Sequence, residues 1–306
     1  MNGLRPSMCV TGNMFRYFTR KKDNKQIMSQ IPEYDFVSRT SQCREEVLNG
    51  IYRSVSNGFR NERVRHNPYK LKLKGYVKHK NKEYFGKSSI VFEMDNIKTN
   101  SLINSNSSIK RTIRYLNLFV GLLDVVVFHN DDDRIRKAKG YGHHNHFEVI
   151  NNELHYNVLS SKWLVSEPVA SIFLGFARDA LTIAYNDGSK LLEEFSEREI
   201  NRIINECDNE SAYHIIFNKI IPYLRRYYFE DPYEYIDEDF VICHNDVEGF
   251  LKMYEKGDSS YNNEFNPENA GDCWDIDMIG DEFGYGIIKY LGLDDDIYNY
   301  GHDDDD

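Results

Sequence analysis

The sequence predicts an α+β fold, with a β-rich, basic N-terminal half that contains hairpins and a helical, acidic C-terminal half. Segments before residue 165 alternate apolar and polar residues with period two, as strands do. After residue 165 come longer apolar stretches with helix start signals. The net charge also changes sign: residues 1–150 hold 27 Lys or Arg and 14 Asp or Glu, whereas residues 151–306 hold 11 and 35.

These observations predict two regions, a basic β-rich region with an N-terminal arm at 1–165 and a helical core followed by an acidic, aromatic-rich region at 166–306. With 41% hydrophobic residues, 22 Tyr and 18 Phe, the chain of 306 residues can bury a core. No stretch approaches the roughly 18–20 apolar residues that cross a bilayer, and residues 1–22 lack the apolar segment of a secretory signal, so we expect a cytoplasmic protein. The five cysteines are widely spaced without a C-x-x-C pair, which predicts reduced thiols and no zinc knuckle.

The first 95 residues predict an arm, a helix and two strands. Residues 16–25 combine basic and aromatic side chains, as an arm would. Val47, Ile51 and Val55 recur at helical spacing and predict a short helix within 42–60. Residues 71–79 and 83–94 alternate in hydropathy, which predicts a hairpin or two neighbouring strands with lysines along one solvent face.

The middle of the chain predicts a loop and further strands. Residues 95–110 are rich in Ser and Asn and predict an exposed loop. The β-branched run at 122–128 predicts a buried strand. Asn151 and Asn152 stand between two short apolar segments and predict the turn of a hairpin.

Helix signals dominate after residue 165. Ser166, Glu167 and Pro168 mark the start of a helix that is apolar nearly all round and therefore central to a core. Ser196 and Glu199 form a capping-box pattern that opens a second helix. A third helix over 211–229 is expected to kink near Pro222.

One histidine cluster favours a metal site. On a strand, His144, His146 and Glu148 would share one face, and imidazole and carboxylate groups bind zinc, iron or manganese. Such a site would activate water for hydrolysis. The alternative is a polar turn before the strand at 147–150.

The acidic C-terminal region predicts a protein-binding surface. It interleaves carboxylates with aromatic residues, and complementary charge steers association with a basic surface on a partner. The residues assigned to partner binding are Glu230, Asp231, Glu234, Asp237, Glu238, Asp239, Asp275, Asp277, Asp281 and Glu282. A solvated acidic surface is the alternative.

No motif for a nucleophilic hydrolase, kinase, dinucleotide site or nucleic-acid module occurs in the sequence, so we expect a non-enzymatic protein without a cofactor and without direct nucleic-acid binding. In its general profile the chain resembles the phage-encoded Gabija anti-defence proteins. That resemblance implies a homo-oligomer, in the cytoplasm of the host cell, that binds a host nucleic-acid-processing complex and blocks its nuclease. The alternatives are a metal-dependent hydrolase or nuclease centred on the histidine cluster, and a phage structural or scaffold protein.

Overall fold

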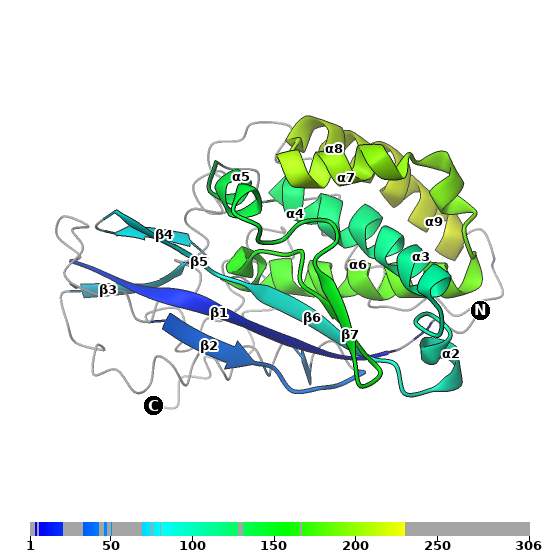
Figure 1. Cartoon of the computed structure of the whole chain (residues 1–306), viewed down its shortest axis with the longest axis horizontal. Coiled ribbons are helices and arrows are strands. Elements are labelled where there is room, and N and C mark those ends of the chain that lie inside the picture. Colours follow the sequence, from blue (N-terminus) through cyan, green and yellow to red (C-terminus); the bar gives the residue numbers. More distant parts are fainter. Residues whose placement is uncertain are drawn as a thin grey trace, which may run out of the picture.

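The computed structural model describes residues 4, 6–20, 33–42, 46–47, 50, 69–74, 76–79, 81–127, 131–165 and 167–229. Six strands form an antiparallel sheet in the order β2-β1-β6-β8-β7, and β3 also pairs with β1 (Figure 1). These strands are β1 (Ser7–Arg20), β2 (Glu33–Val37), β3 (Tyr69–Lys74), β6 (Ser88–Glu93), β7 (Phe147–Ile150) and β8 (Glu153–Tyr156). A separate hairpin consists of β4 (Tyr76–His79) and β5 (Lys82–Phe85).

The helices cover one face of this sheet (Figure 1). The first group is α2 (Ile97–Asn100), α3 (Asn106–Leu116), the π-helical turn η1 (Asn117–Gly121), α4 (Leu122–Val127) and α5 (Asp131–Ala138). The second group is the 3₁₀ turn η2 (Ser161–Val165), α6 (Glu167–Asn186), the 3₁₀ turn η3 (Leu191–Glu194), α7 (Glu197–Glu206), α8 (Asn209–Ile215), the π-helical turn η4 (Ile216–Ile220) and α9 (Ile221–Phe229).

The sheet has an apolar face, and burial alternates with the two-residue period in β8, whereas residues 88–92 of the central strand β6 are buried on both faces. Register places Met8, Phe92 and Leu154 in one row across β1, β6 and β8, and Val10, Ile90 and Tyr156 in the next. All six are buried in the same core cluster as the helical residues. Strands and helices are therefore held together by one core, as the predicted α+β class requires.

The helix α6 lies at the centre of that core, as its sequence predicts. Every residue from Ile172 to Ala184 is buried. Trp163 stacks on Phe173 with ring centroids 5.4 Å apart, which joins η2 to α6. Helix α7 begins after Ser196, whose side chain accepts a hydrogen bond from the Glu199 backbone N–H, so the predicted N-cap is confirmed.

The predicted hairpin at 147–156 is also confirmed. Strands β7 and β8 pair around Asn151 and Asn152, which have φ angles of 51° and 64°. Both angles lie in the left-handed region that a type I′ turn requires, and Asn tolerates that region better than most residues. The hairpin predicted from 71–79 and 83–94 is confirmed in β4 and β5, which pair from Tyr76 with Phe85 to His79 with Lys82. The other parts of these segments pair elsewhere, β3 with β1 and β6 with β1 and β8.

Two predictions for the middle of the chain are wrong. The run expected as a buried strand at 122–128 is helix α4 up to Val127, because it continues the helical path of α3 and η1. Hydropathy cannot distinguish a buried strand from a buried helix when the apolar run is short. The expected loop at 95–110 contains α2 and the start of α3, whose N-caps are the side chains of Asn96 and Ser105.

Other predictions fall partly outside the described residues. The basic segment 16–25, expected as an arm, belongs to β1 as far as Arg20. Of the range 42–60, in which a helix is expected, only Gln42, Glu46, Val47 and Gly50 are described, and the last three are helical. A kink is expected near Pro222, and in this stretch the π-helical turn η4 ends at Ile220 and α9 begins at Ile221. Core residues lie on both sides of residue 165, and the boundary placed there stays a prediction.

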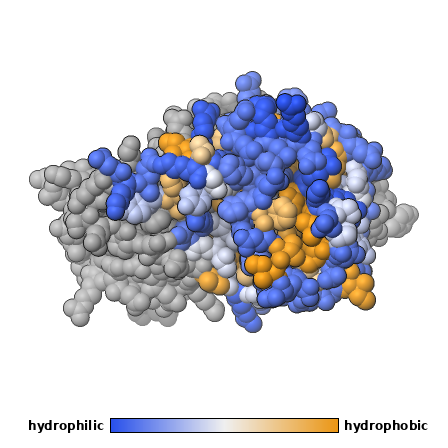
Figure 2. All heavy atoms as spheres, viewed as in Figure 1, coloured by the Kyte–Doolittle hydropathy of each residue, from blue (hydrophilic) through white to orange (hydrophobic). Residues whose placement is uncertain are grey.

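The described surface is mostly hydrophilic in the view of Figure 2, with a hydrophobic patch over the position of β7. No helix in the described ranges is long and apolar enough to cross a membrane.

Candidate functional site

The structure separates the three residues of the predicted metal site. Strand β7 begins at Phe147, so His144 and His146 precede it and do not share a strand face with Glu148. The ring Nδ1 of His144 lies 2.9 Å from the amide nitrogen of Asn205. The ring Nδ1 of His146 accepts a hydrogen bond of 3.2 Å from the Gly142 backbone N–H. Glu148 stands across the hairpin from His155.

Each histidine is instead engaged in holding the loop between α5 and β7. Burial lowers the pKa of His146 despite the opposing field of Glu148, which favours the neutral ring whose Nδ1 accepts the Gly142 bond. Among the residues that the structure describes, no group of three or more His, Cys, Asp or Glu side chains could hold a metal ion. The hypothesis of a metal-dependent hydrolase therefore gains no support from the histidine cluster.

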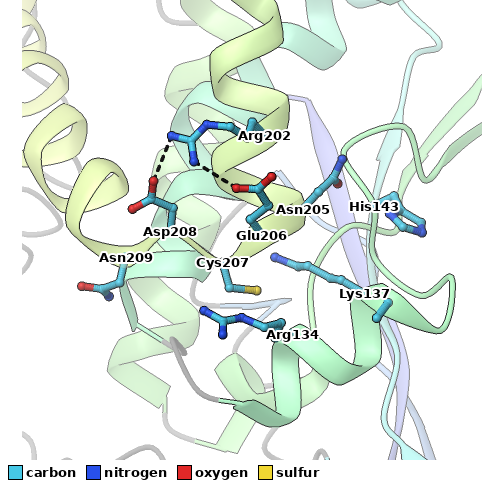
Figure 3. A pocket seen from close by; sticks show the side chains of 10 residues that line it. Arg134, Lys137, His143, Arg202, Asn205, Glu206, Cys207, Asp208 and Asn209 are labelled. Carbon is cyan, nitrogen blue, oxygen red and sulfur yellow. Dashed lines mark hydrogen bonds and ion pairs between the residues drawn. The ribbon is translucent and has the colours of Figure 1, made fainter.

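A hollow of about 750 Å³ lies where α7 ends and α8 begins (Figure 3). Its lining comes from α5, from the loop that follows α5 and from the junction of α7 with α8. Figure 3 shows Arg134 and Lys137 on one side and Arg202, Glu206 and Asp208 on the other. Its size is in the range of small-molecule sites, so its charges decide what it can hold.

Apart from Arg134, whose side chain lines the hollow, the arginine, lysine and carboxylate groups there take part in the helix junction itself. The buried Lys137 donates from Nζ to the carbonyl oxygen of Ile204 at 2.8 Å, near the C-terminal end of α7. Arg202 contacts Glu206 at 3.0 Å and Asp208 at 2.9 Å. Although burial opposes it, hydrogen bonds from Ser211 and the pairing with Arg202 lower the pKa of Asp208.

An anion entering the hollow would compete with these existing contacts and meet two carboxylates. A polyphosphate needs cations that are free to bind it. Lys137 and Arg202 are therefore not available to a nucleotide phosphate, and we interpret most of the lining as a structural junction between helices.

The face of the sheet turned away from the helices carries a different set of side chains. We call it the outer face and define it by Cys9, Glu93, Glu148, Glu153 and His155. Register aligns Cys9, Val91, His155 and Glu148 in one row and Ser7, Glu93, Glu153 and Ile150 in the next. The partners in such rows have Cβ atoms roughly 5 Å apart.

The outer face is an acidic environment. Glu93 and Glu153 are direct cross-strand partners, an arrangement of like charges that destabilises an isolated sheet. His155 Nε2 lies 3.0 Å from Glu153 Oε2. Burial raises the pKa of the Cys9 thiol and the fields of Glu153 and Glu93 raise it further, although a hydrogen bond with Thr40 opposes them. An acidic face of this kind attracts cations, including ammonium groups.

Sequence reasoning missed the outer face. The period-two pattern at 88–93 and 153–156 carried a signal, since Glu93, Glu153 and His155 fall at the polar positions. Their proximity, however, depends on pairing between strands 60 residues apart in the sequence. The ten carboxylates predicted to bind a partner, all between residues 230 and 282, lie outside the described residues.

Comparison with known proteins yields a structural similarity only. No protein-family model matches the chain, and no curated protein matches it. The fold is similar to that in the crystal structure of the complex between the prokaryotic ubiquitin-like protein Pup and its ligase PafA, with a TM-score of 0.54 and 10% sequence identity. The similarity covers 86% of this chain and 66% of that chain, slightly less than two thirds of its length.

This similarity overturns the prediction of a non-enzymatic inhibitor that binds a host defence nuclease. The finding associates the fold with a ligase, and a ligase is an enzyme. The profile resemblance to the Gabija anti-defence proteins, the homo-oligomer it implies and the structural or scaffold alternative are not tested by the comparison and stay predictions.

Proposed function

We propose that the chain is a ligase that joins a carboxyl group to an amino group, with a protein as one of its substrates. The observation that carries the proposal is the fold similarity to the ligase of a ubiquitin-like protein over 86% of this chain. Because one fold hosts several functions, the proposal must be tested on the chemistry of a site.

We place the reaction on the outer face of the sheet. Glu93 and Glu153 supply the negative field that attracts an ammonium group. His155, in contact with Glu153, is positioned to accept the proton that the amine must lose before it attacks. The contact with Glu153 also orients the imidazole ring, as a carboxylate partner commonly does.

Amide formation from a carboxylate requires activation, and a nucleoside triphosphate is the co-substrate we assign. A carboxylate oxygen attacks the terminal phosphorus and releases the diphosphate. The amine nitrogen then attacks the acyl carbon, inorganic phosphate leaves, and the amine proton passes to the base. No described residue is assigned to the nucleotide, since Lys137 and Arg202, two of the cations of the hollow in Figure 3, are already paired.

A hydroxylamine assay tests the proposal without knowledge of the natural amine. The purified full chain is incubated with ATP, Mg²⁺, hydroxylamine and a panel of carboxylate donors that includes free glutamate and glutamate-terminated peptides. We expect hydroxamate and ADP to form together in equal amounts. The Glu153→Gln and His155→Asn variants should lose at least about 90% of this rate, as removal of a general base commonly costs about 10²-fold.

Glu197→Gln is the matched control, because Glu197 is a solvent-exposed carboxylate on α7, on the helical side of the sheet. It should retain the full rate. If no donor supports hydroxamate formation, or if Glu153→Gln is as active as the wild type, the ligase proposal or its placement on the outer face is wrong.

A further inference from the structure

Strand β7 forms one edge of the six-stranded sheet. It is the last strand in the order β2-β1-β6-β8-β7, and within the described ranges it pairs only with β8 (Figure 1). An edge strand presents a row of backbone groups that can pair with another chain. Pairing of another chain with β7 depends on which of its backbone groups point to the open edge and on the side chains beside them.

The turn determines which backbone groups of β7 point away from β8. In a hairpin with a two-residue turn, the flanking residues Ile150 and Glu153 exchange hydrogen bonds, and bonded pairs then alternate along the ladder. Glu148 with His155 is the next bonded pair. The bonded pair after that is His146 with Asn157. The Asn157 N–H donates to the His146 carbonyl at 2.9 Å, as the alternation requires.

Val149 therefore belongs to a non-bonded pair, and its N–H and C=O point to the open edge. The described part of the chain supplies no hydrogen-bond partner to either group. One residue of an added strand could accept from and donate to Val149 without disturbing β8.

The side chains at this edge are apolar on both faces. Val149 is 38% exposed and Ile150 46% exposed, and Phe147 is partly buried. Figure 2 shows a hydrophobic patch over the position of β7. The strand contains no Pro, Lys or bulge, three of the devices that prevent an edge from pairing, although it has only four residues and one of them is the charged Glu148.

The charge beside the edge specifies the partner. Glu148 is exposed on the outer face, and Glu153 follows on the adjacent strand. A strand added to β7 would place alternate side chains next to Glu148 and Ile150 on the outer face, with Glu153 one strand further, and next to Val149 on the other face. Basic side chains suit the first face and apolar side chains the second.

We propose that β7 is the docking edge for an extended segment of a partner protein in which basic and apolar residues alternate. The segment adds a strand to the sheet by hydrogen bonding to Val149. This inference concerns binding alone and stands whether or not the chain is a ligase.

Binding of a labelled peptide to the full chain tests the proposal. The probe is a fluorescein-labelled seven-residue peptide of alternating lysine and valine, and fluorescence anisotropy gives its Kd. Val149→Pro removes the edge N–H but no bond to β8, and proline is tolerated on edge strands. We expect this variant to weaken binding about tenfold, and Glu148→Lys to weaken it to a similar extent.

Ile97→Asp is the matched control, since Ile97 is a 93% exposed apolar residue on α2, away from β7. It should leave the Kd unchanged. A glutamate–valine peptide should bind the wild type at least about tenfold more weakly than the lysine–valine probe and should bind the Glu148→Lys variant better than it binds the wild type.

A second probe does not depend on the folding of any variant. N-methylation of alternate peptide bonds removes the donors along one edge of the probe, and we expect loss of binding for the version methylated on the edge that faces β7. Equal binding of both methylated versions and of the parent peptide would overturn the proposal, as would no detectable binding of the parent or an unchanged Kd for a folded Val149→Pro variant.

Discussion

At the scale of single residues, the π-helical turn η1 brings a helix unusually close to the sheet. The Leu122 N–H donates to the Asn117 carbonyl five residues earlier, which widens the turn. The amide of Asn117 then reaches two partners, the His144 carbonyl oxygen at 3.0 Å and the Tyr156 hydroxyl at 2.9 Å. This buried network connects η1, the loop before β7, and β8.

Gly121 makes that approach possible, and its replacement is the first prediction. A Cβ at this position would lie 2.9 Å from the Tyr156 hydroxyl oxygen and 2.9 Å from Ile204 Cδ1. We expect Gly121→Ala to lower the free energy of unfolding by about 1–3 kcal/mol in urea denaturation, although alanine favours helices.

Ile204→Val in the Gly121→Ala background serves as the control, because valine lacks the crowded Cδ1 atom. It should cost less there than it does in the wild type. A Gly121→Ala variant more stable than the wild type would show that β8 and α7 move apart at little cost.

At the scale of elements, the β7–β8 hairpin depends on two consecutive left-handed residues. Asn151 and Asn152 adopt left-handed backbone conformations, with φ angles of 51° and 64°. The turn sets the register of the hairpin, and the register in turn decides that Glu148 and His155 share the outer face.

Asn152→Val tests this dependence. A β-branched residue is strained in the left-handed region, so we expect a loss of about 1–2 kcal/mol in the free energy of unfolding. Asn152→Gly should be at least as stable as the wild type, because Asn-Gly is the preferred pair for this turn. Equal losses for both variants in thermal unfolding would mean that the asparagine side chain, and not the backbone angle, matters here.

At the scale of the whole molecule, one core joins the sheet to helices that are distant from it in the sequence. Several tyrosines lie where α3 and α9 meet the end of α6. Burial, aided by the charge of Asp187, raises the pKa of Tyr115 to about 12. Burial also raises the pKa of Tyr223, whose hydroxyl donates to Asp187 at 2.5 Å, and that of Tyr227. These residues hold α9 and α3 against the end of α6.

The raised tyrosine pKa values predict instability in alkali. In the unfolded chain tyrosines lose their protons near pH 10, whereas folded Tyr115 keeps its proton up to about pH 12. Between these values the unfolded state binds fewer protons, so the free energy of unfolding falls as pH rises, by up to about 1.4 kcal/mol per pH unit for each such tyrosine. Tyr223→Phe should make this fall less steep in urea titrations from pH 8 to 11.

Tyr185→Phe is the control, since Tyr185 is 39% exposed. It should leave the slope as in the wild type. A slope that Tyr223→Phe does not change would assign the alkaline instability to other groups.

Local sequence signals predicted much of the helical half and one hairpin. Three of these signals are local, because each depends on residues within a few positions of one another: the N-cap at Ser196, the apolar α6 and the turn at Asn151. The sequence alone therefore predicts them. The failure at 122–128 has the same origin, since a short run of β-branched residues suits a strand locally. The packing of α3 and η1 on α6, and of α4 on α7 and α8, favours a helix instead.

The sequence alone determined the α+β class, the change in charge along the chain and the elements whose signals are local. The tertiary structure alone decided that β1 pairs with β2, β3 and β6, that Glu93 meets Glu153 across two strands and that β7 is left at an edge. The similarity to the structure of a complex that contains a ligase is also visible only in the tertiary structure. The physical reason is that strand pairing joins residues that are distant in the sequence through backbone hydrogen bonds, which every residue except proline can form, so no local pattern of side chains specifies the partner.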